Sequence, residues 1–540
     1  MSPEPWILAV DLGNGGPKVA AVTCQGEVLR TAMRPVRVRI GLDGEATQDA
    51  TEWWQGLTAA TREIVGGGVD PRTLHAVAIT GQWGSTVAID RAGQPVGDVI
   101  LWADTRARDL MRDVVGGRVS VSGMAPHKVL PFVRLTGGAP TPSGADPTGA
   151  CLLLRERFPE LYARTATLLE PVDYLGLRFT GRVAATPASM TLSWLTDNRP
   201  GAPVGYLDGL VARARRDRDR LPELLPTGSV LGTLSPEVGD ELGLMPGAPV
   251  VCGIPDLHAA VVGSGAVAPY ASHLAVSTTQ WFGTRVPFKR TDPFHQIATI
   301  PGLDPHHPVV ANNQETGAAA LQWLREQIIA PDDDLLGGGS GIGRQGAAPE
   351  ADNPTFEQLL ALAARAPAGS EGLLFMPWLN GERSPVEDKL ARGGWLNVSL
   401  RTDRALLIRS VLEGVAYNAR WLFETYRTFL RRPVPSLRIL GGGAQSDLWC
   451  QIYADVLGIP VEQVGTPRHA QLRGVALWAR ICLGEIRLED VAALVPVAAT
   501  YHPAPERRAG YDAAYAEYRT LHRRLRGLYR RLNGDLPAPG

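Results

Sequence analysis

The sequence predicts an α/β protein made of two related domains. Apolar runs at 7–10 and 19–23 flank a glycine-rich turn, which predicts an opening β-hairpin with a loop longer than two residues. Residues 49–65 have helical spacing, and 74–90 suggest a strand, a glycine break and a second strand. Residues 273–288 (HLAVSTTQWFGTRVPF) repeat the order of the opening ILAVDLGNGGPKVAAV. This echo is either coincidence or a repeated domain, and a repeat would place a ligand cleft between the two copies.

Length and composition narrow the classes of function. A chain of 540 residues is too long for one simple core. Its net charge of −1 favours neither a nucleic acid nor an anionic membrane as partner. The five cysteines are scattered without a CxxC pair, so we expect no disulfide framework or structural zinc, and a reducing cytoplasmic location. We also expect no signal peptide and no transmembrane helix, because no apolar run reaches about 18 residues.

Composition also suggests how the chain is divided. We expect an N-terminal domain at 1–262, a C-terminal domain at 263–490 and a helical extension at 491–540. Residues 331–354 are rich in Gly, Asp and Pro and predict a flexible insertion. A basic amphipathic helix at 509–533 is expected to pack on the body of the protein rather than on a membrane or calmodulin.

The opening turn has the composition of an anion site. Gly13, Gly15 and Gly16 leave backbone N–H groups accessible, while Asp11 could hold a metal ion and Lys18 could neutralise phosphate charge. The alternative is an ordinary hairpin turn. The sequence contains neither GxxxxGK[ST] nor a strand–turn–helix GxGxxG, so no motif supports a P-loop or Rossmann site.

Two later stretches could also carry chemistry. Asp256 follows an apolar run and precedes a predicted helix at 257–262, a position that suits a general base or a plain helix cap. Cys252 and His258 lie nearby, but their spacing matches no strong metal motif. The glycines at 441–443 end a strand before a helix and form either a platform for a nucleotide or a tight turn.

The order of these stretches resembles that of the FGGY carbohydrate kinases, in the actin/hexokinase-like (ribonuclease H-like) superfamily. The resemblance covers roughly residues 5–485. It rests on DLGNGGPK, GQWGSTVAIDRAGQPVGDVILWADTRA, GIPDLHAAVVGSGAV, STTQWFGTRV, GERSPVEDKLARGGW with RSVLEGVAYNAR, and GGGAQSDLWCQIYADVLGIPV. It implies two ribonuclease H-like domains with the active site in the cleft between them, and transfer of phosphate from ATP to a sugar.

The resemblance also implies a role for individual residues. Asp256 would be the base that deprotonates the sugar hydroxyl, and Asp11 would hold Mg²⁺. The sugar would contact Gln82, Trp83, Trp102, Asp104 and Asp256. ATP would contact Gly13, Asn14, Lys18, Thr278, Thr279, Gly317, Gly441, Gly442, Gly443 and Ala444.

The GERSP and LEGVAYNAR stretches resemble the xylulokinase-like branch most, which implies D-xylulose as substrate and D-xylulose 5-phosphate as product. The family usually has Thr at Asn14 and Gly at Ser277, and xylulokinases often have Met-His at Trp83-Gly84. These departures leave ribulose, erythritol or glycerol open as substrates, and also a catalytically silent sugar- or nucleotide-binding regulator. An actin-like filament protein needs no sugar site, so that alternative would leave the stretch GQWGSTVAIDRAGQPVGDVILWADTRA unexplained. A homodimer is compatible with the resemblance.

Overall fold

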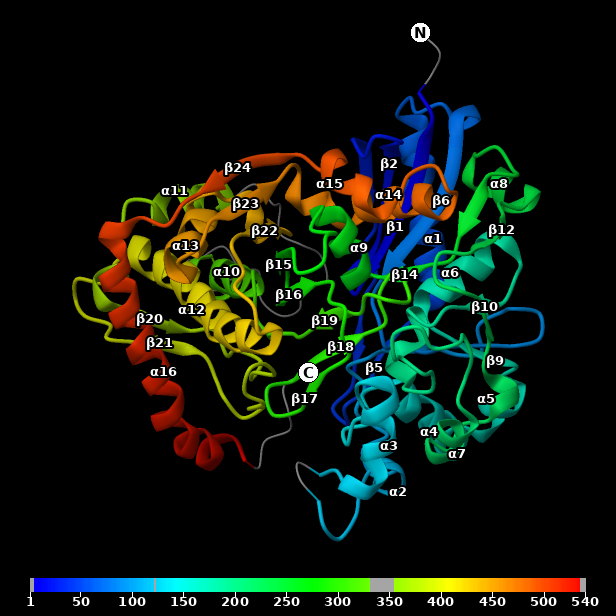
Figure 1. Cartoon of the computed structure of the whole chain (residues 1–540), viewed down its shortest axis with the longest axis horizontal. Helices are drawn as coiled ribbons and strands as arrows, with labels where there is room; N and C mark the ends of the chain where they lie inside the picture. The colour runs from blue at the N-terminus through cyan, green and yellow to red at the C-terminus, as the bar shows by residue number, and fades with distance from the viewer. Residues whose placement is uncertain (1–3, 121–122, 331–353, 535–540) are drawn as a thin grey trace, which may run out of the picture.

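The computed structural model describes residues 4–120, 123–330 and 354–534, which form two lobes (Figure 1). The lobe on the right, with the blue strands, holds the N-terminal sheet, and the lobe on the left holds the C-terminal sheet. The expected insertion at 331–354 lies, apart from Pro354, outside the described residues. No helix within the described ranges is both long and apolar enough to cross a membrane.

The N-terminal sheet has seven strands, in the order β12-β13-β6-β1-β2-β3 with β14 also beside β6. Alternate side chains of β1 point to opposite faces, as expected for a strand. Leu8 and Val10 join the core under α1 (Ala50–Gly66), while Ile7 and Ala9 face α9 (Asp256–Ser264) and α14 (Ala470–Cys482). The strands are β1 (Trp6–Gly13), β2 (Gly16–Thr23), β3 (Val28–Met33), β6 (Leu74–Gly81), β12 (Val230–Thr233), β13 (Pro249–Val251) and β14 (Ile254–Pro255).

The first hairpin is tighter than the sequence predicted. β1 and β2 pair as far as Gly13 and Gly16, so the loop is the two residues Asn14 and Gly15 and the expected longer loop is wrong. The strands extend beyond the apolar runs, since Asp11 pairs with Lys18 and the ladder continues to the turn. Gly16 closes the turn at φ +114°, and a Cβ there would overlap the carbonyl oxygen of Arg34.

The C-terminal sheet repeats the arrangement of the first. β15 and β16 form an antiparallel hairpin and β15 pairs in parallel with β22, as β1 pairs with β2 and with β6. The echo at 273–288 is therefore confirmed as a repeated topology. The sheet order is β16-β15-β22-β23-β24. The strands are β15 (Ser272–Val276), β16 (Gln280–Thr284), β22 (Leu437–Leu440), β23 (Val461–Val464) and β24 (Val497–Tyr501).

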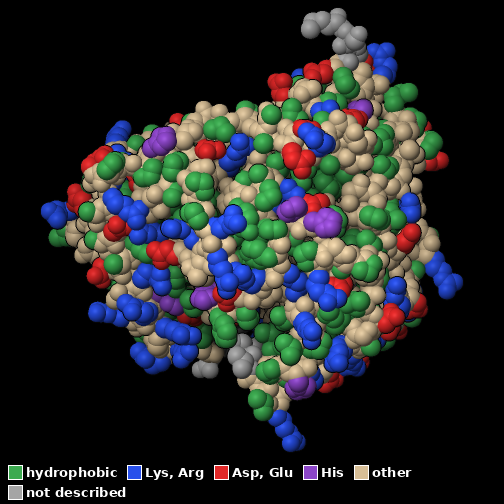
Figure 2. Space-filling view, viewed as in Figure 1, with side chains coloured by type: hydrophobic (Ala, Val, Ile, Leu, Met, Phe, Trp, Pro, Cys, Tyr) green, Lys and Arg blue, Asp and Glu red, His purple; other side chains and the backbone are tan. Residues whose placement is uncertain are grey.

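The end of the chain belongs to the C-terminal lobe. The expected helical extension at 491–540 is corrected in part, because β24 is a strand that pairs with β23. The amphipathic helix is α16 (Pro505–Asn533), and its tyrosines are buried against α12 (Arg404–Leu430), so the expected packing on the body is confirmed. Figure 2 shows Lys and Arg side chains gathered along the lower left edge, over the outer surface of α16.

Two helices join the sheets. α9 (Asp256–Ser264) and α14 (Ala470–Cys482) share one apolar core with strands of both lobes. They cross so closely that a Cβ on Gly474 would overlap the carbonyl oxygen of Ala259. Arg473 of α14 also donates to the carbonyl oxygen of Gly26 in the N-terminal lobe (3.1 Å). The predicted boundary at 262/263 falls inside α9, and the division into domains stays a prediction.

Candidate active site

Three parallel strands end at one edge of the N-terminal sheet. Leu12 of β1 is level with Gly81 of β6, and Gly81 is level with Pro255 of β14. The next residues along β6 and β14 are Gln82 and Asp256, so both leave the sheet beside the β1–β2 turn. Ligands of open α/β sheets bind at the carboxyl ends of strands, which makes this edge the candidate site.

Asp256 is the first residue of α9, and its Oδ1 accepts the N–H of Leu257 at 2.7 Å. Burial raises the pKa of Asp256 to about 7, and the negative charge of Asp11 adds to the rise. The N–H of Leu257 and the charge of Lys18 act in the opposite direction. A carboxylate with a pKa near neutrality is suited to accept a proton from a hydroxyl group.

Asp11 lies on the face of β1 that points towards α9. Its carboxylate is buried, and its Oδ2 is 3.5 Å from the Nζ of its cross-strand partner Lys18. No group of three or more His, Cys, Asp or Glu within the described ranges could hold a metal ion. Mg²⁺ needs no such group, since it is commonly held by one or two carboxylates together with phosphate oxygens and water. Asp11 therefore fits a magnesium ion that arrives with a nucleotide.

The stretch at 81–107, to which the resemblance assigns the sugar contacts, lies against the β1–β2 hairpin. The indole N–H of Trp102 donates to the side-chain oxygen of Asn14 at 3.1 Å. The indole N–H of Trp83 donates to the carbonyl oxygen of Ser189 at 2.7 Å, and its ring meets the edge of His258 with centroids 5.9 Å apart. The structure thus brings the predicted sugar and phosphate residues of this lobe together.

The second hairpin lies beside the glycine platform. Ala275 of β15 is level with Leu440 of β22, so Ser277 and Gly441 follow at the same edge. Gly441 has φ +96°, and a Cβ there would overlap the carbonyl oxygen of Val276. Gly317 donates its N–H to the carbonyl oxygen of Thr278 at 2.8 Å. Residues from three separate stretches, Thr278, Gly317 and Gly441, therefore meet in the C-terminal lobe.

The two halves of the site approach each other near one turn of the C-terminal lobe. The 3₁₀ turn Pro467–His469 supplies the carbonyl oxygen of Pro467 to the N–H of Gly441 at 2.9 Å. The pKa of His469 is lowered by burial and by the positive charges of Arg468, Lys18 and Arg473. Lys18 of the first hairpin is therefore close to a turn that supports the glycine platform.

The comparisons with known proteins agree with this geometry. The family model described as "FGGY family of carbohydrate kinases, N-terminal domain" matches residues 6–126, and that for the C-terminal domain matches residues 281–482. The chain belongs to the FGGY family of carbohydrate kinases. It is therefore an ATP-dependent sugar kinase, as the resemblance implied, and the predicted two-domain actin/hexokinase-like fold is confirmed.

Relatives of this FGGY kinase differ in the substrate that their names give. The xylulose kinase of Escherichia coli (strain K12) is 26% identical over 522 residues, covering 96% of this chain and 99% of its own. The gluconokinase of Bacillus licheniformis is 22% identical over 541 residues, covering 98% and 96%. The structure of ligand-bound xylulose kinase from Lactobacillus acidophilus superposes with a TM-score of 0.81 at 19% identity, covering 98% and 100%.

Two predicted site residues of this FGGY kinase already make hydrogen bonds within the protein. Both carboxylate oxygens of Asp104 accept from Arg106, and Oδ2 also accepts the N–H of Ala46, so Asp104 braces its loop and has no free oxygen for a sugar. Ala444 is fully buried, and its carbonyl oxygen accepts from Gln463 at 2.7 Å. Asp104 is thus corrected to a support of its loop, whereas the contact of Ala444 with ATP stays a prediction.

Two of the glycines remain open to a ligand. A Cβ on Gly13 or on Gly442 would meet nothing within 4 Å. By contrast, a Cβ on Gly441 or Gly443 would press on Val276, so these two glycines are required by packing. The open pair therefore leaves the backbone of each lobe accessible from outside.

Sequence reasoning missed two buried polar residues beside the site. Gln48 donates its side-chain N–H to the carbonyl oxygen of Asn14 at 2.8 Å, and Glu170 accepts the N–H of Gly84 at 2.9 Å. Burial and the neighbouring Asp173 raise the pKa of Glu170 well above its usual range. Gln48 immediately precedes the predicted helix at 49–65, and Glu170 precedes a proline. Polar residues are common at both kinds of position, so the sequence gave no sign that these two residues support a site.

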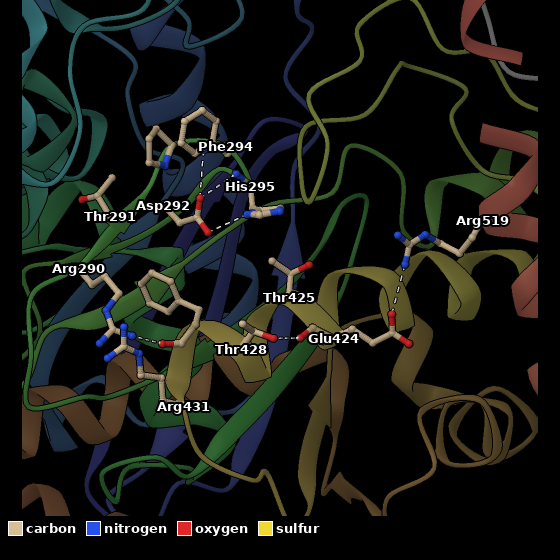
Figure 3. A pocket seen from close by; sticks show the side chains of 12 residues that line it. Arg290, Thr291, Asp292, Phe294, His295, Glu424, Thr425, Thr428, Arg431 and Arg519 are labelled. Atoms are coloured by element: carbon tan, nitrogen blue, oxygen red, sulfur yellow. Dashed lines mark hydrogen bonds and ion pairs between the residues drawn. The ribbon is translucent and has the colours of Figure 1, made fainter. Parts of the chain in front are cut away.

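A separate groove of about 620 Å³ lies in the C-terminal lobe and contains none of the predicted site residues. Figure 3 shows it between a loop carrying Asp292 and His295 and the helix α12 carrying Glu424. Asp292 pairs with His295 at 2.7 Å, and Arg519 of α16 pairs with Glu424 at 3.3 Å. These two pairs neutralise four of the charged side chains that line the groove.

Proposed function

We propose that this FGGY kinase phosphorylates D-xylulose to D-xylulose 5-phosphate, with Asp256 as general base. The observation that carries the proposal is the half-buried carboxyl of Asp256, with its pKa near 7, at the strand edge shared with Asp11 and Gln82. Asp256 takes the proton of the sugar hydroxyl, whose oxygen then bonds to the γ-phosphorus of ATP as the bond to the β-phosphate bridging oxygen breaks. ADP leaves with the displaced electron pair.

The proposed nucleotide site spans both lobes. Gly13, Asn14 and Lys18 lie at the phosphates from the N-terminal side, and Thr278, Thr279 and Gly317 from the C-terminal side. Gly442 offers its open face to the adenosine. Asp11 would hold Mg²⁺, which would supply positive charge to the phosphate oxygens when bound.

The choice of sugar rests on two supports. The first is the xylulose kinase relative that matches nearly the whole chain, and the second is the resemblance of the GERSP and LEGVAYNAR stretches to that branch. The gluconokinase relative has almost the same coverage and makes D-gluconate the second candidate. Gly84 stands where xylulokinases often carry a histidine, so the sugar itself is the part of the proposal that most needs a test.

The test is ADP release with Mg²⁺ and ATP over a panel of sugars, for the wild type and Asp256→Asn together. The panel holds D-xylulose, L-xylulose, D-ribulose, L-ribulose, D-fructose, D-gluconate, glycerol, erythritol and xylitol. We expect D-xylulose to stimulate release most, and the variant to lose the stimulation while still binding nucleotide. Stimulation by another compound replaces the substrate, and retained turnover in the variant removes Asp256 from the base role. Sugar-dependent thermal shifts without any ADP release would instead identify a silent binding protein.

A further inference from the structure

A closed ring of hydrogen bonds joins the first phosphate turn to the sugar stretch. Trp102 is the member that touches both sides: its indole N–H donates to the Oδ1 of Asn14 (3.1 Å), and its main-chain N–H donates to the Oγ of Ser85 (3.1 Å). Ser85 donates to the Oε1 of Gln82 (3.1 Å), whose Nε2 donates to the Oε1 of Gln48 (3.3 Å). Gln48 Nε2 closes the ring on the carbonyl oxygen of Asn14 (2.8 Å).

The ring fixes which way the side chain of Asn14 points. An indole N–H can only donate, so the atom of Asn14 that it meets must be the amide oxygen. The –NH₂ group of Asn14 is therefore turned away from Trp102, and among the described residues it has no hydrogen-bond partner. Asn14 lies exposed at the tip of the hairpin, beside the open face of Gly13.

The opposite end of the ring is rigid. Gln48 is fully buried, and its Oε1 accepts from the indole of Trp53 (3.1 Å) as well as from Gln82. Its Nε2 also lies within 3.4 Å of the carbonyl oxygen of Val36. Since every polar atom of the Gln48 side chain is engaged, the ring is anchored in the core of the lobe and holds the exposed turn from inside.

We propose that Trp102 is a positioning residue for the phosphates of ATP, acting through Asn14. By taking the amide oxygen, it holds the two N–H donors of Asn14 towards the nucleotide. An asparagine without this partner would be free to flip its amide and present an oxygen to the phosphates. The proposal rests on the proposed function, which places Asn14 at the phosphates and Trp102 at the sugar, and it makes the two subsites one hydrogen-bonded unit.

A double-mutant cycle tests this inference. The affinity for the β,γ-imido analogue of ATP, with Mg²⁺, is measured by titration calorimetry for the wild type, Trp102→Phe, Asn14→Ala and the double variant. Phenylalanine keeps an aromatic ring but removes the indole donor. Since a hydrogen bond to a charged group is worth a factor of about ten or more, we expect Asn14→Ala to weaken binding about tenfold. Trp102→Phe should weaken it several-fold alone and not at all in the Asn14→Ala background.

Two further variants sharpen the result. Asn14→Asp keeps an acceptor for Trp102 but replaces the donors by negative charge, so it should bind the analogue more weakly than Asn14→Ala. Trp54→Phe is the matched control, because the indole of Trp54 donates to Glu241 (2.8 Å) outside the ring, and its affinity should equal that of the wild type.

Each failure of the cycle has a distinct meaning. Unchanged affinity in Asn14→Ala, or a loss in Trp102→Phe that persists in the Asn14→Ala background, overturns the positioning role. Because Asn14 is at an exposed turn tip, its alanine variant should fold normally, which thermal unfolding checks. The titrations need no turnover, so a protein that phosphorylates none of the sugars refutes the proposed function while the cycle still decides the role of Trp102.

Discussion

Replacing Asp256 by asparagine should stabilise the free protein at alkaline pH, even though it removes the proposed base. Asp256 has its pKa raised from 3.8 to about 7 in the folded protein. Below pH 3.8 the carboxyl is protonated in both the folded and the unfolded chain and costs nothing. As the pH rises to about 7, the unfolded chain releases this proton first, so stability is lost progressively over that window and remains low above it.

The size of the effect follows from the shift. A difference of about 3 pKa units, at 1.36 kcal/mol each, corresponds to about 4 kcal/mol of lost stability at pH 8. Asparagine has no charge to bury, although its amide must still find partners, so we expect a gain of about 2 to 4 kcal/mol. With an unfolding entropy of about 2.1 cal/mol/K per residue, that gain raises the melting temperature by about 2 to 4 °C if the whole chain unfolds together.

The assay is differential scanning calorimetry of the wild type and Asp256→Asn at intervals from pH 4.5 to 8.5, without nucleotide. The advantage of the variant should grow with pH and level off above about pH 7. Asp49→Asn is the control, because it removes one negative charge from a half-exposed helix cap where asparagine serves equally well. An advantage of Asp256→Asn that is the same at pH 5 and pH 8, or absent at both, would refute the reasoning.

Three more predictions concern activity and stability. The kcat/KM of the wild type should fall as the pH drops below about 7, because Asp256 must be ionised to accept a proton; a flat profile from pH 5.5 to 8 would contradict its role as base. Asp11→Asn should raise the Mg²⁺ concentration needed for half-maximal turnover by about tenfold or more, and an unchanged magnesium dependence would remove Asp11 from the metal site. Gly474→Val should destabilise the protein by more than about 2 kcal/mol in thermal unfolding, since its side chain would strike Ala259 of α9; Gly442→Ala, at an open position, should not.

The local elements were predictable from residues near one another in the chain. Helical spacing over 49–65 corresponds to α1, whose cap is Asp49, and the apolar run before Gly81 corresponds to β6. The expected helix after Asp256 is α9, and the glycine run at 441–443 does end a strand. These features depend on periodicity and on single turns, which neighbouring residues determine.

The predictions from sequence failed where charged or polar side chains pair within the protein. Asp11 and Lys18 lie outside the predicted apolar runs, but their charges are tolerated in the strands because they face each other at the open end of the ladder. Asp104 looked like a sugar ligand, yet Arg106, two residues away, uses both of its oxygens. A sequence gives the spacing of such pairs but not the direction of their side chains.

By itself the sequence determined the α/β class, the kinase family and the position of Asp256 after a strand, and it suggested the repeated hairpins. These follow from patterns short enough to be read along the chain. Only the tertiary structure decided that Gln48, Gln82, Ser85 and Trp102 close a ring on Asn14, and which glycines face open space. The physical reason is that hydrogen bonds and close contacts depend on side-chain direction and on strand register between segments far apart in sequence. Thus the order of the motifs was enough to recognise the family, whereas the orientation of the side chains within the site could be determined only from the tertiary structure.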